Sequence, residues 1–533
     1  MNPDAIVIGA GPNGLVAANV LADAGWSVLV LEANHEPGGA VRTAEVTAPD
    51  FRNDLFSAFY PFTAASPVIA DLDLGSFGLR WTHAPKVLVN PRLDLPAAVL
   101  SRDIDVTAAS LDRSAPGDGD RFRAVFDRWC AVSGPLMNCL LRPFPPVRHA
   151  VRLLHDIGLS GTIDLARRAL LPLRRMIEEE QFEGEPSALL FAGNALHADL
   201  TPEVSGSALF GWMLTCLGQQ HGFPVPVGGA ASITEALVRR ATALGVELEC
   251  DQLVTRVAVS ASKVVGVTTA DGTCVASRVV LADCDVTTLM TKMVGTNKLP
   301  GEYVNGLRLV QRAASTFKID WAVESPVPWL DPDVVGAGTV HVAESVDELS
   351  VTAAQIAMRQ IPDRPFVLVG QMTTSDPTRS PIGTESMWAY THVPQHATSD
   401  AGGRGITTNW TPSDVEAFAE RVERRIEQHA PGFASRIRAR HVMSPHDLER
   451  LDRNLVGGDI GGGTAQLHQQ LVFRPLNGWA RPETPIGGLY LASASAHPGG
   501  AVHGACGANA ARAALLHHPV RRVTRRWARK SLP

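Results

Sequence analysis

Three glycines near the start of the chain have the spacing that allows a backbone to bind a phosphate. Gly9, Gly11 and Gly14 form a G-x-G-x-x-G pattern directly after the apolar run Ala5–Ile8. The first glycine permits a tight turn, the second lets the backbone approach a pyrophosphate, and the third lets a helix pack against the strand. Glu32 lies 18 residues after Gly14, where a carboxylate suits a ribose hydroxyl. Together these residues predict a dinucleotide-binding site.

The same stretch contains the elements that must position this site. Ala5–Ile8 predicts a strand buried on both faces. Leu15, Ala18 and Leu21 mark the inner face of a helix that ends near Gly25, and a second strand leads to Glu32. Because a strand, a turn and a helix follow in this order, a dinucleotide site is favoured over a purely structural glycine turn.

The residues after Glu32 favour FAD over NAD, since both cofactors fit the first glycines equally well. Gly38 and Gly39 give backbone N–H groups close access to a ligand, and Arg42 follows three residues later. A guanidinium at this point can pair with a phosphate or cover the edge of a flavin.

With these residues the sequence resembles the FAD-dependent oxidoreductases related to amine oxidases and carotenoid desaturases, and more closely the phytoene dehydrogenase-like group. Glu32, the Gly38-Gly39 pair and Arg42 carry the first part of the resemblance. Further matching motifs follow in family order at residues 49–51, 53–55, 223–229, 455–459, 473–475, 488–491 and 497–500.

The resemblance implies a set of FAD contacts along the chain. It places the backbone of Val254 at the adenine and closes the turn from Ser493 to Gly500 over the flavin, in front of a helix from about Ala501 to Leu516. Ser493 and Ala501 stand where the family usually has glycine. The predicted cofactor-binding residues are Gly9, Ala10, Gly11, Pro12, Asn13, Gly14, Glu32, Ala33, Gly38, Gly39, Ala40, Val41, Arg42, Val254, Ser493, Gly500 and Val502.

His497 is the candidate catalytic acid or base because it lies in this closing turn. The alternative is a histidine that only orders the turn through a hydrogen bond, and we favour that alternative. His503 and His197 are weaker candidates. The resembled desaturases do not depend on a defined catalytic side chain.

Length, composition and charge limit the class of protein. The chain has 533 residues, 45% hydrophobic and 19% charged, with a formal net charge of −6. These values predict a soluble globular protein of about three domains and give no support to nucleic-acid binding. We expect a cytoplasmic protein, since we recognise neither a signal peptide nor a membrane-spanning run. The seven cysteines form no C-x-x-C pair, which argues against zinc and a redox disulphide.

The predicted fold class is α/β. A Rossmann-type FAD-binding domain is assembled from segments 1–72, 223–290 and 451–516, and a substrate domain is inserted as a helical part, 73–222, and a mixed α/β part, 291–450. Within the second part, residues 387–393 predict a strand with Trp388, Tyr390 and His392 on one face. The basic tail, 517–533, follows the last segment.

Two basic stretches suggest peripheral contact with a membrane. Residues 137–176 combine seven arginines with leucines and prolines, as in an amphipathic helix on an anionic bilayer. A solvated helical face is the alternative, and we favour it. For the tail at 517–533 we predict weak, salt-sensitive vesicle binding, at about 1 kcal/mol per basic residue, with a solvated segment as an equal alternative.

The predicted function is transfer of a hydride to FAD from an apolar substrate, of isoprenoid or acyl type, by a dehydrogenase or desaturase. The electron acceptor stays open between oxygen, a quinone and another molecule. Two alternatives stay open as well. One is a flavoprotein that acts as a binding or regulatory partner with little turnover, and the other is an amine oxidase-like flavoenzyme.

Overall fold

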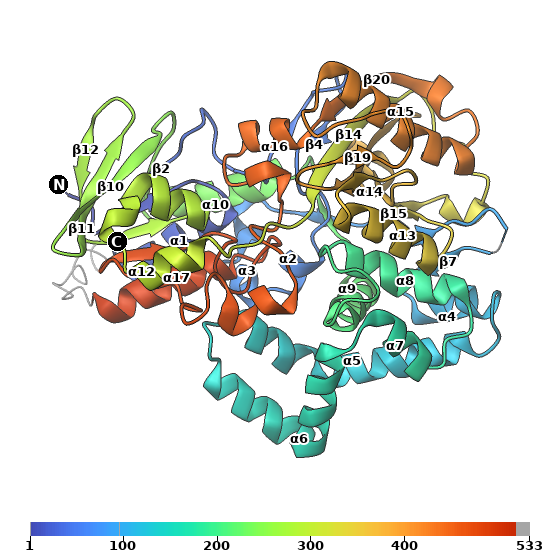
Figure 1. Ribbon diagram of the computed structural model, residues 1–533, viewed down its shortest axis with the longest axis horizontal. Coiled ribbons are helices and arrows are strands. Elements are labelled where there is room, and N and C mark those ends of the chain that lie inside the picture. Colours follow the sequence, from blue (N-terminus) through green and yellow to red (C-terminus); the bar gives the residue numbers. More distant parts are fainter. Residues whose placement is uncertain (1, 95, 519–533) are drawn as a thin grey trace, which may run out of the picture.

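The segments predicted to share one domain meet in a parallel sheet of five strands. The computed structural model describes residues 2–94 and 96–518, so the predicted basic tail lies outside the described residues from position 519 on. In the sheet, strands from both ends of the chain lie beside strands from its middle, all parallel (Figure 1). Their order is β21 (Leu489–Leu491), β13 (Val280–Ala282), β1 (Ala5–Ile8), β2 (Val28–Leu31) and β9 (Glu247–Glu249). The discontinuous Rossmann-type sheet is thus confirmed.

Both faces of this sheet are covered, as the apolar run of β1 predicts. Ala5 and Val7 pack into a core with three helices, whereas Ile6 and Ile8 belong to a second core. The helices are α1 (Pro12–Asp23), α10 (Ala231–Ala243) and α17 (Ala505–His517). The other face packs against an antiparallel sheet of β10 (Val254–Ser260), β11 (Lys263–Thr269) and β12 (Cys274–Ala276). Alternate side chains of one strand therefore serve two apolar layers.

Helix α17 lies very close to α1 because its residues are small. A Cβ added to Gly507 would lie 1.9 Å from the carbonyl oxygen of Asn13, so only glycine fits there. The helix begins at Ala505, four residues after the predicted start. Ala501 and Gly504 have φ angles of 86° and 68°, and this left-handed backbone delays the helix.

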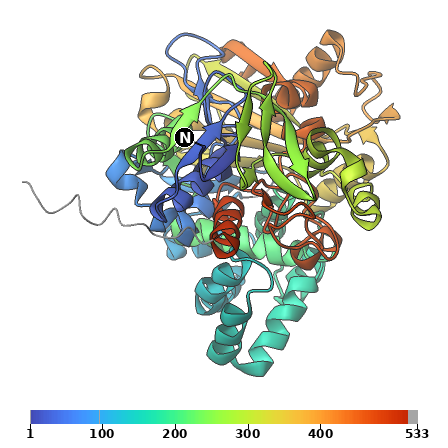
Figure 2. The same ribbon diagram turned by 90° about the vertical axis from the view of Figure 1, so that its left-hand side faces the viewer.

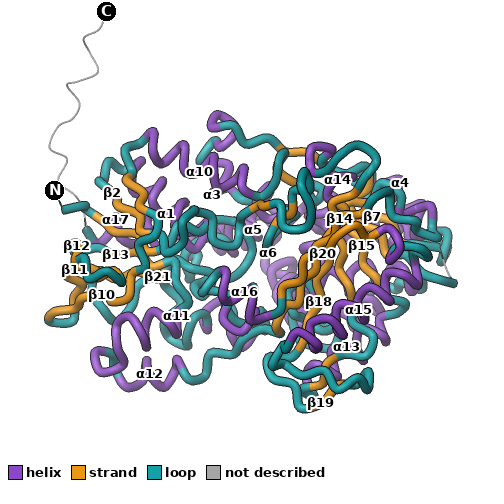
Figure 3. Tube along the Cα trace, turned by 90° about the horizontal axis from the view of Figure 1, so that it is seen from above, coloured by secondary structure: helices purple, strands orange, loops and turns teal. Residues whose placement is uncertain are grey.

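The second sheet is mixed and has seven strands (Figure 3). The predicted strand at residues 387–393 lies near its centre, and two strands from the segment predicted as helical complete one edge. The order is β20 (Ile437–Met443), β14 (Ser315–Val323), β18 (Glu385–Val393), β17 (Val367–Gln371), β15 (Ala337–Val342), β6 (Lys86–Asn90) and β7 (Ala98–Leu100). The substrate domain of the sequence prediction therefore shares one sheet between its two inserted parts.

A lobe of helices lies below both sheets in the view of Figure 2. It consists of α4 (Ile104–Asp112), α5 (Asp118–Leu140), α6 (Val147–Leu170), α7 (Leu173–Glu179), α8 (Glu185–Leu196) and α9 (Ser207–His221). The stretch 73–222 is mainly helical, and its strands are β6, β7 and the two-residue strand Trp81–Thr82. Among the described residues, no helix combines the length and the apolar character needed to cross a membrane.

Further elements connect and cover these layers. The remaining helices are α2 (Pro61–Ala65), α3 (Pro67–Asp71), α11 (Val286–Thr288), α12 (Gly301–Leu307), α13 (Val346–Ala357), α14 (Met372–Ser375), α15 (Pro412–His429) and α16 (Pro445–Leu451). Two-stranded ladders pair β3 (Thr43–Ala44) with β4 (Asn53–Asp54), β5 (Trp81–Thr82) with β8 (Val225–Pro226), and β16 (Gln360–Ile361) with β19 (Ser399–Asp400).

A buried carboxylate joins three separated parts of the chain. Asp54 is fully buried and forms an ion pair with Arg379, which is also fully buried. The other contacts of Asp54 are the Thr43 hydroxyl, which donates over 2.7 Å, and the Ala230 N–H, which donates over 2.8 Å. Arg379 also forms an ion pair with Asp376, at 3.3 Å. Because charges removed from water must be paired, these contacts fix how the parts fit together.

Arg379→Ala should therefore lower the free energy of unfolding by about 3–5 kcal/mol, because it leaves a buried charge without its partner. Arg404→Ala is the matched control, since Arg404 pairs with Glu420 over 2.6 Å while both side chains are 42% exposed, and its loss should cost at most about 1 kcal/mol. Chemical denaturation measures both. Equal effects of the two substitutions would contradict the role of the buried pair.

Candidate functional site

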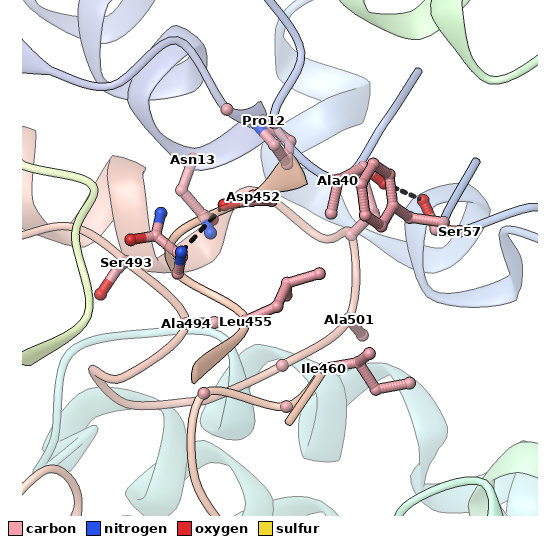
Figure 4. A pocket seen from close by; sticks show the side chains of 18 of the residues that line it. Pro12, Asn13, Ala40, Ser57, Asp452, Leu455, Ile460, Ser493, Ala494 and Ala501 are labelled. Atoms are coloured by element: carbon pink, nitrogen blue, oxygen red, sulfur yellow. Dashed lines mark hydrogen bonds between the residues drawn. The ribbon is translucent and has the colours of Figure 1, made fainter. Parts of the chain in front are cut away.

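A cavity of about 680 Å³ is lined by residues of both sheets. The turn after β1 and the end of β2 form one part of its wall, and residues of β14, β18 and α9 form another. Figure 4 shows Asn13 and Ser493, from opposite ends of the chain, in the same wall. The volume is in the usual range for cofactor and ligand sites.

The three glycines of the first turn are required by its geometry. Gly9 has a φ of 93°, which favours glycine. A Cβ on Gly14 would lie 2.1 Å from the Gly9 carbonyl oxygen, and one on Gly11 would lie 2.8 Å from a carboxylate oxygen of Asp283. The turn therefore brings α1 against β1 as the spacing predicts.

The N-terminus of α1 at the cavity suits an anionic ligand. Its N-cap residue is Gly11, which has no side chain to cap the helix, and Pro12 follows. Helix N-termini carry partial positive charge and bind phosphates. The side-chain oxygen of Asn13 is buried beside the cavity and has no hydrogen-bond partner among the described residues. A bound dinucleotide fits both features, since buried polar atoms need partners.

Glu32 lies at the end of β2 and lines the cavity. One carboxylate oxygen accepts the Ala10 N–H over 2.7 Å, and the other accepts the Asn34 N–H over 2.9 Å. The oxygen bound to Asn34 also accepts the Asn34 side-chain amide over 3.0 Å, so the oxygen bound to Ala10 is the one that keeps capacity for another hydrogen bond. The side chain is thus held rigidly in a position where it can accept a ribose hydroxyl.

The second glycine loop rests on the first. A Cβ on Gly39 would lie 3.1 Å from the Gly11 Cα atom. Arg42 is 6% exposed, and its guanidinium donates to the carbonyl oxygens of Gly39 over 2.9 Å and Leu451 over 3.0 Å. Arg42 is therefore engaged with the backbone of neighbouring loops and lies behind the cavity wall.

Most of the predicted cofactor residues share this wall. Those that line the cavity are Gly9, Gly11, Pro12, Asn13, Glu32, Ala33, Gly39, Ala40, Val41, Val254, Ser493, Gly500 and Val502. The other four, Ala10, Gly14, Gly38 and Arg42, support the wall from behind: the N–H groups of the first three donate to Glu32, Asp283 and the Ala10 carbonyl.

Two acidic residues at the cavity were missed by the sequence analysis. Asp283 accepts the Gly14 N–H over 2.9 Å, and burial raises the pKa of Asp283 to about 7, with Asp452 and Glu32 adding to the shift. Burial also raises the pKa of Asp452. Asp283 could have been found, since it follows β13, and ligands of parallel sheets bind at the carboxyl ends of strands.

His497, the candidate catalytic residue, is buried behind the wall, whereas its neighbour Pro498 lines the cavity. Burial and the charge of Arg474 lower the pKa of His497 to about 4, and Phe144 packs edge-on at 5.9 Å. The imidazole therefore lies away from the cavity, and neither of its nitrogens has a hydrogen-bond partner among the described residues, so the ordering hydrogen bond of the alternative is not seen either. Of the three histidines considered, His197 is the one that lines the cavity. His503 is buried, and burial lowers its pKa to about 4.

The predicted face of β18 forms an aromatic wall. Trp388, Tyr390 and His392 all line the cavity, whereas Met387 and Ala389 pack into a separate core, which confirms the predicted alternation. The Trp388 and Tyr390 rings are stacked, with centroids 5.8 Å apart. The wall continues into apolar side chains of other elements, namely Phe59, Phe62, Phe210, Leu214 and Phe223.

Two ionisable residues lie in the part of the cavity beside the aromatic wall: Lys318 forms an ion pair, and Asp199 has a raised pKa. The Lys318 ammonium donates to both Asp320 oxygens over 2.5 and 2.6 Å. Asp199 accepts the Ala314 N–H over 3.1 Å, and burial raises the pKa of Asp199 to about 7. The sequence analysis missed Lys318 and Asp199. The partner of Asp199 is 115 residues away, and although Asp320 is close to Lys318 in the sequence, nothing local places their strand, β14, at the cavity.

Comparison with known proteins agrees with this geometry. Residues 7–72 match the NAD(P)-binding Rossmann-like domain. The mouse protein named pyridine nucleotide-disulfide oxidoreductase domain-containing protein 2 is 29% identical, over 95% of this chain and 92% of its own length. The chain is a homologue of that protein. Although the name of the mouse protein mentions disulfides, all seven cysteines of this chain are unpaired.

More distant similarities place this homologue in a broader group. A lycopene-forming phytoene desaturase of Pseudescherichia vulneris is 23% identical over 57% of this chain and 58% of its own. The structure of cyclohexylamine oxidase from Brevibacterium oxydans has the same fold, with a TM-score of 0.55 and 18% identity over 97% of this chain and 98% of its own. The chain is thus similar in sequence to a desaturase and shares its fold with an amine oxidase.

The raised pKa of Asp283 has a consequence for stability. From an ordinary value of 3.8 it rises to about 7, so the folded protein keeps a proton that the unfolded chain releases as the pH rises through this window. Stability should therefore fall between about pH 4 and pH 7. Asp283→Asn keeps an oxygen for the Gly14 N–H and removes the titration. Relative to wild type, the denaturant concentration at the unfolding midpoint of Asp283→Asn should increase as the pH is raised from about 5 to about 8. A difference between the two proteins that stays constant over this range would contradict the assignment.

Proposed function

We propose that this chain binds FAD non-covalently in the cavity and oxidises an apolar small molecule. The observation that carries the proposal is that a single cavity joins the glycine turn to the aromatic wall of β18. FAD is favoured over NAD by the second loop around Gly39 and by the closing segment from Ser493 to Val502, both of which line the cavity.

Different residues of the cavity wall would bind different parts of FAD. The N-terminus of α1 would hold the pyrophosphate, Glu32 a ribose hydroxyl, and the backbone of Val254 the adenine. Ser493, Gly500 and Val502 would lie along the flavin ring. When bound, FAD supplies a hydride acceptor.

The rest of the cavity supports an apolar substrate. Phe210, Leu214 and Phe223 together with Trp388 offer mainly apolar contact, and burial of apolar area contributes about 25 cal/mol per Å² before ordering costs. These side chains exclude water from the space that the substrate occupies. A long isoprenoid or acyl chain fits this lining, and the electrons leave to oxygen, a quinone or another acceptor.

Gly11→Val should abolish retention of FAD, because the branched side chain would collide with Asp283 and occupy the approach of the pyrophosphate. Gly301→Val is the matched control, since a Cβ at Gly301 meets no atom within 4 Å. The measurement is the flavin absorbance of purified protein after reconstitution. A colourless wild type that takes up no FAD would contradict the proposal, as would a yellow Gly11→Val variant.

The chain length of the substrate should control how tightly it binds, which can be measured from the rate of flavin reduction under anaerobic conditions. Across a series of isoprenoid and acyl compounds, apparent affinity should rise with length, since each added buried CH₂ contributes about 0.8 kcal/mol. Short polar amines and amino acids are the comparison. Faster reduction by the amines would assign the chain to the amine oxidase side of the superfamily, and no reduction by any compound would favour a binding or regulatory role.

We further propose that helix α6 docks on an anionic membrane surface. Its exposed apolar side chains include Val147 and Val151 in its first half and Leu159 and Ile163 in its second, each 61–68% exposed. Several arginines lie on the same helix, and the helix lies at the outer side of the lobe (Figure 2). Apolar and basic side chains together are typical of helices that lie in a bilayer interface.

Replacing Val151 and Ile163 by serine should reduce binding to vesicles that contain phosphatidylserine, because less apolar area enters the interface. The same replacement of Val335 and Val351, which are 66% and 57% exposed outside α6, is the control and should have no effect. Co-sedimentation at two salt concentrations measures the binding. A chain that ends at Leu516 tests the tail separately, and unchanged binding of the α6 variant would exclude this helix.

A further inference from the structure

A chain of hydrogen bonds leads from the cavity into the protein interior. The Tyr390 hydroxyl lies 2.9 Å from the Nδ1 atom of His197, and the Nε2 atom of His197 lies 2.8 Å from the Nε2 atom of His341. Tyr390 and His197 line the cavity, whereas His341 is fully buried behind them. The Nδ1 atom of His341 has no partner among the described residues.

These contacts allow two proton arrangements, which differ at the two ends of the chain. In one, the Tyr390 hydroxyl donates to His197, His197 donates to His341, and His341 is left with an N–H at Nδ1. In the other, His341 donates to His197 and His197 donates to the Tyr390 oxygen. The second arrangement leaves only a bare lone pair at Nδ1 of His341.

The second arrangement is the favourable one. A buried N–H group without an acceptor is rarer in proteins than a buried acceptor without a donor, and the first arrangement would create such an N–H against Gly193, where a Cβ would lie 2.5 Å from Nδ1. With the proton of His197 donated to its oxygen, the Tyr390 hydroxyl keeps its own proton for a partner in the cavity.

We infer that Tyr390 donates a hydrogen bond to an oxygen acceptor of the substrate, so that the substrate is an uncharged, mainly apolar molecule that carries an oxygen function such as a carbonyl. This inference rests on the proposed function and narrows its substrate class. The two histidines act as positioning residues, and Tyr390 is the residue that selects the substrate.

The surroundings of Tyr390 favour an uncharged acceptor. Burial lowers the pKa of His197 to about 3 and that of His392 to about 4, so both rings are neutral at physiological pH. The Nε2 atom of His392 donates to the Leu196 carbonyl oxygen over 3.1 Å. The Lys318 charge is balanced by Asp320. A carboxylate or an ammonium group therefore gains little from the groups that surround this donor.

A ketone tests whether Tyr390 acts as a donor, because a ketone oxygen can accept a hydrogen bond and cannot donate one. Calorimetric titration of the FAD-loaded protein compares 2-octanone with n-octane, for wild type and for Tyr390→Phe. Tyr390→Phe should lower the affinity for 2-octanone about fivefold, as expected for one neutral hydrogen bond, and leave the affinity for n-octane unchanged. Trp388→Phe is the matched control on the same face and should weaken both ligands alike.

The outcomes separate this inference from the proposed function. An unchanged affinity of Tyr390→Phe for n-octane shows that the cavity is intact in the variant. Equal effects of Tyr390→Phe on both ligands, or no effect on either, would overturn the donor role while the apolar cavity stands. If wild type binds neither ligand, the apolar substrate of the proposed function is wrong, and the inference fails with it.

Discussion

The structure depends on a backbone contact that admits no side chain. Helix α1 can lie against β1 only because Gly14 meets the Gly9 carbonyl directly, and α17 can lie against α1 only because Gly507 meets the carbonyl of Asn13. β1 is the central strand of its sheet, between partners from residues 280–282 and 28–31. The close contacts therefore bring the start, the middle and the end of the chain to one edge, where the cavity begins.

Buried charge supplies the second constraint. The pair of Asp54 and Arg379 connects the first segment to the region before β18, and Lys318 and Asp320 pair within β14. Such pairs contribute little net stability compared with apolar packing, but a wrong arrangement would leave a charge unpaired in the interior. The Asp54–Arg379 pair joins remote segments and so favours one relative placement of the two sheets, and the cavity needs that placement because its two walls come from different sheets.

The sequence predicted the parts of this fold whose signals are local. The glycine turn, Glu32 and the alternation of Trp388, Tyr390 and His392 each follow from spacing along a few residues. Arg42 shows the limit, because one of its two carbonyl partners, that of Leu451, is 409 residues away, so this contact has no local signal. The same holds for strand β6, whose apolar run is short and whose partner β15 lies far along the chain, with Ala337 opposite Lys86. Strand β7 is equally short and pairs with β6.

His497 and His197 show why position in a motif did not identify the polar residue at the cavity. His497 lies in the closing turn, yet the turn directs Pro498 and Gly500 to the cavity and the imidazole away from it. His197 lies after α8 in no motif, and it reaches the cavity because β15 and β18 bring His341 and Tyr390 to its two ring nitrogens. Contacts between a helix end and two strands cannot be read from spacing.

The electrostatic character of the cavity follows from the same burial that shapes it. Burial holds the histidines of the wall neutral and raises the pKa of Asp199 and Asp283 to about 7. In a region of low dielectric, directed dipoles act more strongly than in water. Because the histidines of the aromatic wall are neutral, the selectivity of this wall depends on the direction of its donors and on apolar contact. This combination suits the oxidation of a neutral substrate, in which the protein must hold a carbon atom in place while keeping water out.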